Sequence, residues 1–187
     1  MQRLHSKEFY YEERGRKRLR THTRAAQFLY LNRTCFNGLY RENLKGEFNV
    51  PIGTKDKVVF EDEDFAEISK VLKRAEIRTA DFEDTISEAR DGDLIFVDPP
   101  YTTAHNMNGF VKYNQNIFSW QDQIRLRDSI YDAVKRGVKV VLTNADHESI
   151  RELYQQTGEY RPIGRASVMA GKSAFRNKTT EALYVFK

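Results

Sequence analysis

The feature that most constrains the fold is an apolar run that ends at two consecutive prolines. Residues 93–97 read Asp-Leu-Ile-Phe-Val, a run of strand length, and Asp98, Pro99, Pro100 and Tyr101 follow at once. Proline has no backbone N–H and a fixed φ, so it cannot continue the hydrogen bonds inside a sheet. The strand must therefore end here and present this tetrapeptide at its tip. In open α/β sheets, ligands bind just outside such carboxyl ends of strands.

Further helices and strands are predicted on both sides of this strand. Helical spacing of apolar residues predicts helices at residues 23–38, 65–72, 82–89, 119–137 and 146–158. Apolar runs predict strands at residues 76–80, 93–97, 138–142, 160–163 and 182–186. Ser119 and Asp146 are the expected N-caps of the last two helices, and Gly38 should break the first. The alternation of strand and helix predicts an α/β fold with a doubly wound, mostly parallel sheet.

Composition divides the chain near residue 75. Residues 1–75 are turn-rich and basic, whereas residues 76–187 carry the α/β pattern, which predicts a recognition region beside an incomplete α/β core. The net charge of +4 is only a weak indication of a polyanionic partner. The basic residues of the first 24 form either a solvated terminus or an arm that contacts phosphates: Arg3, Lys7, Arg14, Arg16, Lys17, Arg18, Arg20 and Arg24.

Several classes of protein are excluded by composition. Apolar residues make up 40% of the chain, which is enough for a core and excludes a disordered protein. No apolar run approaches the roughly 20 residues that span a bilayer, so we expect neither a membrane protein nor a secretory signal. A single cysteine, Cys35, excludes a disulfide framework and a multi-cysteine metal site, and it fits a reducing, cytoplasmic setting. The four histidines lack ligand spacing, so we expect no metal.

The tetrapeptide itself suggests a chemistry. Asp98 supplies a carboxylate acceptor, the two prolines hold the backbone rigid, and Tyr101 supplies an aromatic ring. Together they could bind a planar amine, with acceptors for its N–H groups and a ring against its face. The alternative is a plain turn from strand to loop, with Asp98 as a capping residue.

Longer motifs carry a resemblance to a known family. They are residues 28–41 (FLYLNRTCFNGLYR), 46–53 (GEFNVPIG), 80–82 (ADF), 98–101 (DPPY), 118–123 (FSWQDQ), 142–144 (LTN) and 181–184 (EALY). In this order they resemble Dam-type, D12 class, adenine-specific DNA methyltransferases. The resemblance runs from about residue 9 to the end of the chain. It implies part of a Rossmann-like methyltransferase sheet that depends on S-adenosyl-L-methionine, with residues 1–75 as a helical, turn-rich DNA target-recognition region.

The resemblance implies roles for the tetrapeptide. The catalytic segment would comprise Asp98, Pro99, Pro100 and Tyr101. The Asp98 carboxylate and the backbone of Pro99 would accept hydrogen bonds from the exocyclic amine of adenine. Tyr101 would stack on the base once it is flipped out of the duplex. The amine would then attack the methyl group of S-adenosyl-L-methionine in line, so catalysis would depend on positioning and electrostatics.

The resemblance also implies binding residues. Asp81 and Phe82 would lie against the adenosine part of the cofactor, with Asp98 at the same site; the alternative is Asp81 as a helix cap and Phe82 in the core. Phe36, Asn37, Leu39 and Arg41 match positions at which the family approaches double-stranded DNA. An aromatic ring can wedge into a base step, and Arg can bind guanine with two hydrogen bonds. For these four the alternative is a structural turn, the interpretation we favour for Gly38.

Two further surfaces are expected to face the DNA. The loop at residues 102–115, rich in Asn and Thr, is long enough to act as a lid over the base. Basic residues near the C-terminus predict a strip that faces phosphates, although a solvated basic face is the usual role of such residues: Arg161, Arg165, Lys172, Arg176 and Lys178.

Some family motifs have no counterpart in the sequence. Family members begin with a lysine-bearing segment and a strand that ends in Phe-x-Gly-x-Gly, and neither is matched. We therefore expect a C-terminal portion of such an enzyme, completed by an N-terminal piece or a separate fragment, with residues 94–97 as an uncovered sheet edge. The alternatives are a catalytically inactive remnant that retains DNA binding, and methyl transfer to a protein amide or an RNA base. The role, in restriction-modification or elsewhere, stays open.

Overall fold

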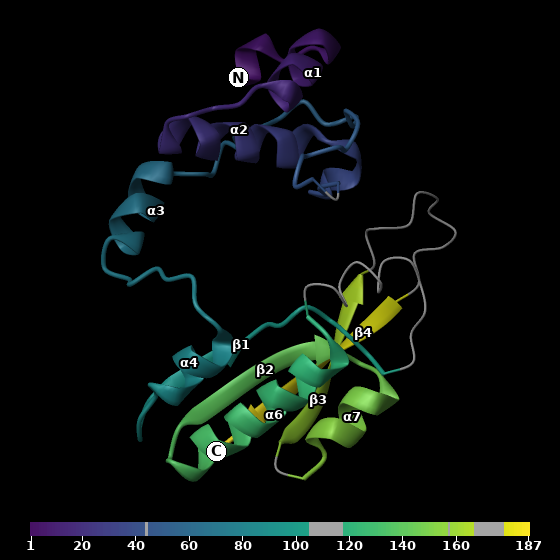
Figure 1. The fold of residues 1–187 in the computed structure, drawn as a ribbon. Helices are drawn as coiled ribbons and strands as arrows, with labels where there is room; N and C mark the ends of the chain where they lie inside the picture. The colour runs from purple at the N-terminus through teal and green to yellow at the C-terminus, as the bar shows by residue number, and fades with distance from the viewer. Residues whose placement is uncertain (44, 105–117, 157, 167–177) are drawn as a thin grey trace. The chain divides into compact units, whose positions relative to one another are not determined.

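The computed structural model divides the chain into two compact units, Met1–Glu76 and Ile77–Lys187 (Figure 1). The residues that it describes are 1–43, 45–104, 118–156, 158–166 and 178–187. Each unit has its own cluster of buried side chains. Among the described residues, no helix has both the length and the apolar character needed to cross a bilayer.

The first unit consists of helices joined by long irregular segments. Its elements are the 3₁₀ helices η1 (Gln2–Leu4) and η2 (Phe36–Gly38) and the α-helices α1 (Lys7–Gly15), α2 (Thr21–Thr34) and α3 (Phe65–Leu72). The predicted helix at residues 65–72 is confirmed, and Asp64 caps it by accepting hydrogen bonds from two backbone N–H groups. The core of the unit is built around Tyr10, Tyr30 and Cys35.

Helix α2 ends at Thr34, four residues before the glycine expected to break it. Cys35 is extended and forms an isolated β-bridge with Ile52, so pairing with a distant segment draws the chain out of the helix. The approach is close because a Cβ at Gly53 would lie 2.5 Å from the Cys35 carbonyl oxygen. Gly38, with φ +64°, belongs to the turn that follows.

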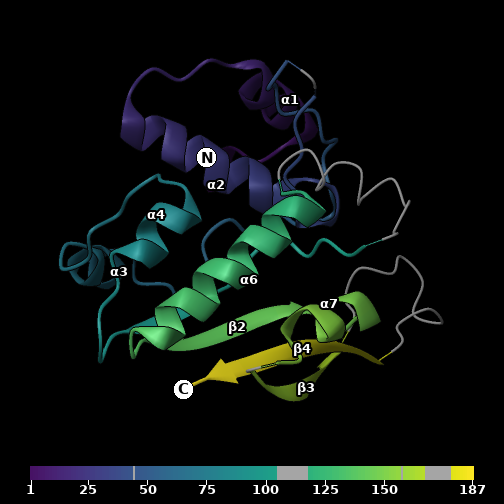
Figure 2. The same ribbon diagram turned by 60° about the horizontal axis from the view of Figure 1, so that its bottom comes forward.

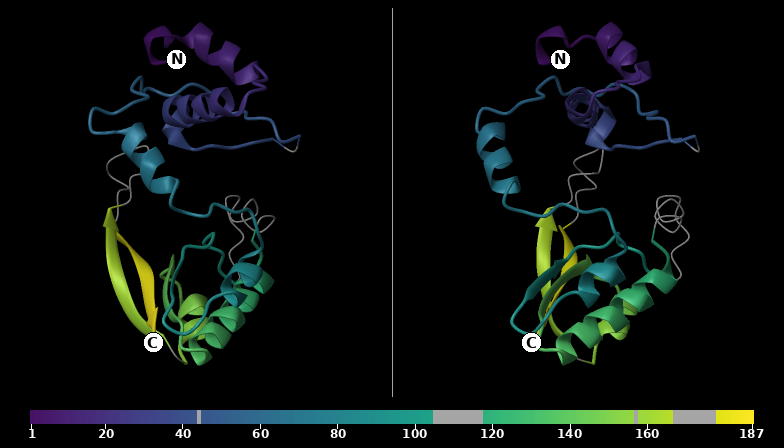
Figure 3. Two further views of the ribbon diagram at one scale, coloured as in Figure 1. Left: turned by 90° about the vertical axis from the view of Figure 1, so that its left-hand side faces the viewer. Right: turned by 60° about the vertical axis from the view of Figure 1, so that its left-hand side comes forward.

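The second unit is a four-stranded mixed sheet with three helices among its described residues. Its elements are α4 (Phe82–Ser87), β1 (Leu94–Val97), α6 (Trp120–Lys135), β2 (Lys139–Ala145), α7 (Glu148–Tyr154), β3 (Glu159–Ala166) and β4 (Lys178–Phe186). The strand order is β1-β2-β4-β3. Figure 3 shows β3 and β4 as a long pair side by side.

The α/β class is confirmed, but the expectation of a mostly parallel sheet is wrong for these strands. Only β1 and β2 are parallel; β4 is antiparallel to both β2 and β3. The reason is the short connection between β3 and β4: they are separated by residues 167–177 alone, fewer than the dozen or more residues that a parallel crossover needs. The two C-terminal strands therefore form an antiparallel pair beside β2.

Two local predictions are also wrong. Residues 76–80 form no strand, because they have no bridge to any residue in the described parts of the chain. Asp146 does not cap α7. His147 does so, accepting a hydrogen bond from the backbone N–H of Ser149, while the Asp146 carboxylate binds side chains from α7, β3 and β4. The Ser119 cap of α6 is confirmed, with a reciprocal bond from Ser119 N–H to Asp122.

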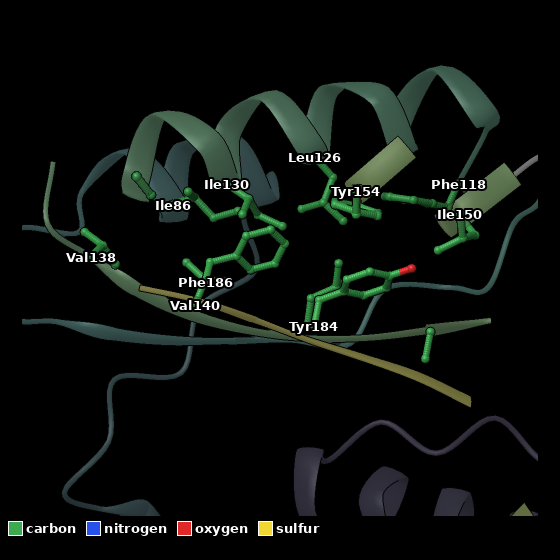
Figure 4. Close-up of a cluster of buried hydrophobic side chains, with 13 residues drawn as sticks. Ile86, Phe118, Leu126, Ile130, Val138, Val140, Ile150, Tyr154, Tyr184 and Phe186 are labelled. Atoms are coloured by element: carbon green, nitrogen blue, oxygen red, sulfur yellow. The ribbon is translucent and has the colours of Figure 1, made fainter. Parts of the chain in front are cut away.

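The core of the second unit lies between its helices and one face of the sheet. Figure 2 shows α6 lying along β2, and Figure 4 shows Leu126 and Ile130 of α6 pointing toward Val140 and Phe186 on the sheet. The opposite face of the sheet is exposed at the edge strand β1, where Leu94 is 69% exposed and Phe96 is 65% exposed. The expected uncovered edge is therefore present in the described sheet.

Candidate functional site

Asp98 lies at the carboxyl end of β1, beside Thr143 of β2. The last paired residues of the two parallel strands are Val97 and Leu142, so the next residues, Asp98 and Thr143, are neighbours. The Thr143 hydroxyl donates a hydrogen bond to Asp98 Oδ1 at 2.7 Å. Asp98 is exposed, so its carboxylate is held by this bond and remains open to a ligand.

A buried polar network holds the backbone segment that follows the two prolines. Gln123, fully buried on α6, donates through Nε2 to the carbonyl oxygen of Thr102 at 3.2 Å and approaches that of Pro100 at 3.5 Å. Its Oε1 accepts from Asn144 Nδ2 at 3.2 Å, and the Thr102 hydroxyl donates to the Phe118 carbonyl oxygen at 2.8 Å. A satisfied buried network of this kind makes the loop rigid. Tyr101, between the two carbonyl groups, is half-buried.

A cavity of about 490 Å³ opens beside the tetrapeptide. Its walls come from the start of α4, from β1 with the residues just after it, and from α6; they include Asp81, Phe82, Asp98 and Pro99. The volume lies within the roughly 300–1,000 Å³ that is typical of small-molecule sites. The structure thus brings the expected cofactor residues to one cavity with Asp98, Pro99 and Pro100 of the expected catalytic segment, whereas Tyr101 is not among the residues that line it.

Arg125 of α6 joins three carboxylates at the wall of this cavity. Its guanidinium lies 3.0 Å from Asp81, 2.7 Å from Glu83 and 2.9 Å from Asp122. It also lies over the Phe82 ring, 4.9 Å from the centroid. The bonds to Glu83 and then to Asp122 raise the pKa of Arg125, and the bonds from Ser119 hold the pKa of Asp122 below its usual value. Arg125 therefore links α4 to α6 and restrains Asp81 and Phe82 at the wall of the cavity.

The structure supports parts of both interpretations of residues 81 and 82. Asp81 caps α4 by accepting a hydrogen bond from Glu83 N, and the Phe82 ring lies 5.8 Å from that of Phe118, at the edge of the core. Both residues also line the cavity. Capping and cofactor contact are compatible here, because the cap uses only one carboxylate oxygen. Their contact with a cofactor stays a prediction.

The four residues expected to approach DNA follow α2 in the first unit. Phe36 is 56% exposed, and Asn37 has φ 57°, an uncommon conformation that Asn tolerates better than most residues. Leu39 is half-buried, and the exposed Arg41 donates through Nε to Asn49 Oδ1 at 3.0 Å. The turn thus presents an aromatic ring, an amide and a guanidinium at the surface. DNA contact by these residues stays a prediction.

The basic surfaces are only partly described. Residues 105–115 of the expected lid, together with Lys172 and Arg176, lie outside the described residues, as do the side chains of Arg165 and Lys178. Arg161 is described and pairs with Glu159 at 2.7 Å. At the N-terminus Arg16 and Arg18 pair with acidic residues of α1, so part of that basic charge is balanced locally.

Four residues of the site were given no role from the sequence: Gln123, Arg125, Thr143 and Asn144. Three of them, Gln123, Thr143 and Asn144, stand inside motifs that carry the resemblance. Two signals were present. Gln123 interrupts the apolar spacing of α6, where a polar residue is buried only if it has partners, and Thr143 and Asn144 follow the apolar run of the strand next to the one ended by the prolines. Arg125 gave no signal, because its three partners are distributed over two helices.

Comparisons with known proteins identify the family that the sequence matches. A family model described as D12 class N6 adenine-specific DNA methyltransferase matches residues 1–168. The type II methyltransferase M1.LlaDCHI of Lactococcus lactis subsp. cremoris is 36% identical over 97% of this chain and 67% of its own length. The DNA N-6-adenine-methyltransferase of Escherichia phage P1 is 43% identical over 72% of this chain but 18% of its own.

A third relative is the DNA adenine methylase of Serratia marcescens, which is 34% identical over 88% of this chain and 61% of its own length. The chain therefore spans about two thirds or less of the length of these three relatives. The family match covers the first unit and most of the second, since it extends from residue 1 to residue 168.

Proposed function

The chain belongs to the D12 class of N6 adenine-specific DNA methyltransferases, and from this we propose that it transfers a methyl group to the exocyclic amine of adenine in double-stranded DNA. The observation that carries the proposal is the position of Asp98 and Pro99. They lie at the end of a parallel strand, at the mouth of a cavity of about 490 Å³. This is where open α/β sheets bind their ligands.

Asp98 and the Pro99 carbonyl act on the target amine. The exocyclic amine of adenine has two N–H groups, and these two acceptors bind one each. Both bonds draw the nitrogen lone pair out of conjugation with the ring and fix its direction, so the rate gain comes from positioning and electrostatics. Tyr101 stacks on the base after it has left the duplex. Pro100 and the Gln123 network keep this segment in place.

The residues of the cavity fit S-adenosyl-L-methionine as the cofactor. Phe82 offers a ring for the adenine of the cofactor, and Asp81 offers a carboxylate oxygen for its hydroxyl or amino groups. When bound, S-adenosyl-L-methionine supplies the electrophilic methyl group. Arg125 keeps Asp81 and Phe82 oriented through its ion pairs and its contact with the ring. Asp98 belongs to both sites, because it lies where the cavity meets the target base.

Residues 1–75, which lie within the first unit, act as the DNA target-recognition region, and residues 76–187 act as the catalytic region. Phe36, Asn37, Leu39 and Arg41 are the proposed base and backbone contacts, and the balance of charge, +4 overall, favours a polyanion. A DNA substrate and a single cysteine both fit a cytoplasmic location. The exposed edge of β1 accepts an added strand, and we assign a complementing N-terminal fragment to this edge.

The test is transfer of tritiated methyl from S-adenosyl-L-methionine to adenine in duplex DNA, with and without an N-terminal fragment from a relative. We expect incorporation in the presence of the fragment. We expect Asp98→Ala to lower it at least about a hundredfold, since it removes an acceptor that acts on the reacting group. Asp132→Ala, on the exposed face of α6, should keep full activity.

The outcomes separate the alternatives. Absence of incorporation in both conditions, with salt-sensitive DNA binding intact, means an inactive remnant that retains DNA binding. Full activity of Asp98→Ala means that the catalytic site has been assigned to the wrong residues. Equal incorporation into RNA of the same sequence shifts the substrate from DNA to nucleic acid in general.

A further inference from the structure

We propose that Thr143 is a positioning residue that fixes the Asp98 carboxylate in the orientation the target amine requires. The inference rests on the proposed function of Asp98, and it concerns a residue of a different strand. It begins from one contact: Thr143 Oγ1 donates a hydrogen bond to Asp98 Oδ1 at 2.7 Å.

The register of the sheet makes this contact a fixed feature of the fold. Phe96 pairs with Val141 in the parallel β1–β2 ladder, and side chains two residues apart on a strand point to the same face. Thr143 therefore continues the row of Val141 on the less buried face of β2, and Asp98 follows Val97 directly beside it. A shift of one residue would send Thr143 toward the core, and the buried Leu142 and Asn144 on either side prevent this.

The hydroxyl has one proton to donate, and the distances decide where it goes. Thr143 Oγ1 lies 2.7 Å from Asp98 Oδ1 and 3.4 Å from the Val97 carbonyl oxygen. A distance of 2.7 Å is the usual value for an O–H···O bond, whereas 3.4 Å is beyond its normal range. The proton therefore goes to the carboxylate. Because the acceptor is charged, this bond is stronger than one between neutral groups.

The bond restrains the Asp98 side chain, which would otherwise be free to rotate because it is exposed. The side chain is exposed, and nothing in the buried network of Gln123 and Asn144 touches its carboxylate. Without a partner, the carboxylate rotates between staggered positions, and only some of them direct an oxygen toward the amine. Thr143 occupies Oδ1 and thereby fixes the plane of the carboxylate, which leaves Oδ2 for the amine. Misplacement of a reacting group by about 1 Å can reduce a rate about a hundredfold.

Threonine suits this position better than serine would. Its branched Cβ restricts χ1 and favours a strand, so the hydroxyl is held in place by its own methyl group. Valine has nearly the same shape and cannot donate. The pair of substitutions Thr143→Val and Thr143→Ser therefore separates the hydrogen bond from packing.

The experiment compares these variants with a matched control in the same sheet. Thr180 of β4 also donates to an aspartate, Asp146, at a distance from the cavity, so Thr180→Val removes a bond of the same kind elsewhere. Two experiments use the full 187-residue chain. The first measures the kcat and KM of methyl transfer with the N-terminal fragment present, and the second measures the carboxyl-carbon NMR signal of Asp98 in aspartate-labelled protein. Asp98→Asn identifies that signal.

We expect Thr143→Val to lower kcat about tenfold and to change the chemical shift of the Asp98 carboxyl signal. The KM for DNA and the KM for S-adenosyl-L-methionine should stay unchanged within about twofold. Thr143→Ser should recover most of kcat and return the signal toward the wild-type position, and Thr180→Val should change neither. A role in packing alone predicts the opposite: normal signals in Thr143→Val, or a Ser variant as impaired as the Val variant. Either result overturns the proposal.

The NMR measurement keeps the two hypotheses apart. Absence of methyl transfer by the wild-type chain counts against the proposed function, while the Asp98 signal still shows whether Thr143 holds the carboxylate. Active wild-type protein with an unchanged Asp98 signal in Thr143→Val counts against the positioning role alone.

Discussion

The two units of the chain are stabilised by different kinds of contact. In the first unit, side chains bind the backbone of distant loops: the Tyr10 hydroxyl donates to the Val50 carbonyl oxygen at 3.0 Å, and Arg33 donates to that of Val58 at 2.6 Å. In the second unit, four strands pair through continuous ladders and pack against helices. Its buried cluster is also larger than that of the first unit.

This difference indicates where each unit is vulnerable. A small core gives little free energy from burial, so the loops of the first unit depend on polar contacts made by buried side chains. The second unit depends on apolar packing against a sheet, and a truncated apolar side chain should cost it most. The site residues follow the same division. Phe36 and Arg41 lie on a turn, whereas Asp98 directly follows a paired strand and Thr143 lies within one.

The chain carries one natural reporter for each unit. Trp120 is its single tryptophan and packs against the core of the second unit, so its fluorescence follows that unit. Cys35 is its single cysteine and is 1% exposed in the first unit, so the rate of thiol modification follows the opening of that unit. Burial also raises the pKa of the Cys35 thiol, which slows its reaction further while the unit is closed.

The largest effect is expected for Ile130→Ala in the second unit. Ile130 is fully buried between α6 and the sheet, so its truncation should cost about 2–5 kcal/mol of unfolding free energy. The measurement is the urea midpoint by Trp120 fluorescence. Lys135→Ala on the same helix removes an exposed ion pair and should change the free energy by less than about 1 kcal/mol.

The same variant tests the independence of the units. If they unfold separately, Ile130→Ala leaves the rate of Cys35 modification in the folded range unchanged. A parallel rise in that rate would show that the two units form one cooperative structure and would remove the basis of the comparison.

A smaller but still large effect is expected for Glu13→Gln in the first unit. Glu13 is fully buried on α1 and pairs with Arg16 and Arg18. Loss of its charge should cost about 2 kcal/mol, because hydrogen bonds to buried charged groups contribute about that much. Cys35 modification should become on the order of 30 times faster at that cost.

Glu12 provides a matched control for this substitution. It is the preceding residue, it also pairs with Arg16, and its side chain is 57% exposed. Glu12→Gln should therefore change the rate of Cys35 modification by less than about threefold. Equal effects of the two substitutions would mean that the ion pairs of Glu13 give no more stability than those of an exposed residue.

The same contrast explains how far the fold could be predicted from the sequence. Features set by adjacent residues were predictable: the end of β1 at the prolines, the Ser119 cap of α6 and the start of α3 after Asp64. Features set by a distant partner were not. The end of α2 depends on the bridge between Cys35 and Ile52, and the direction of β4 depends on β3.

The candidate site follows this rule as well. The acceptors and the ring of the tetrapeptide are consecutive in sequence, so their chemistry could be predicted from the residues themselves. Thr143 meets Asp98 only because β1 and β2 pair in one particular register, and Gln123 meets Asn144 only when α6 packs on the sheet. A single sequence does not encode such pairings in any local pattern, which is why they became apparent only in the folded chain.

A pH-dependent effect is expected for Asp146→Asn in the second unit. The Asp146 carboxylate accepts hydrogen bonds from Thr180, Tyr160 and Arg151, and these bonds lower its pKa below the usual value, about 3.9 for Asp. A carboxyl group with a lowered folded-state pKa stabilises the protein above its unfolded pKa, and this stability is lost as pH falls through the folded value. The wild-type urea midpoint from Trp120 should therefore fall below about pH 4 more steeply than that of Asp146→Asn.

Asp132→Asn controls for the loss of a carboxylate as such. Asp132 lies on the exposed face of α6 with 64% of its side chain accessible, and it pairs with Lys135. Its acid profile should match that of the wild type. If Asp146→Asn also follows the wild-type curve, the hydrogen bonds at Asp146 make no difference between the folded and unfolded states.

The smallest effect is expected for Tyr10→Phe, which tests whether single polar contacts matter in the first unit. Tyr10 is fully buried, and its hydroxyl donates to the Val50 carbonyl oxygen. Removal of the hydroxyl leaves that carbonyl oxygen with one bond fewer and should cost about 1 kcal/mol, a rise of roughly fivefold in the rate of Cys35 modification. Tyr11→Phe, at the adjacent exposed ring, should leave this rate unchanged. Equal rates in the two variants would show that burial of the Tyr10 ring, rather than its hydroxyl, stabilises the unit, and the contrast with the second unit would then be one of core size alone.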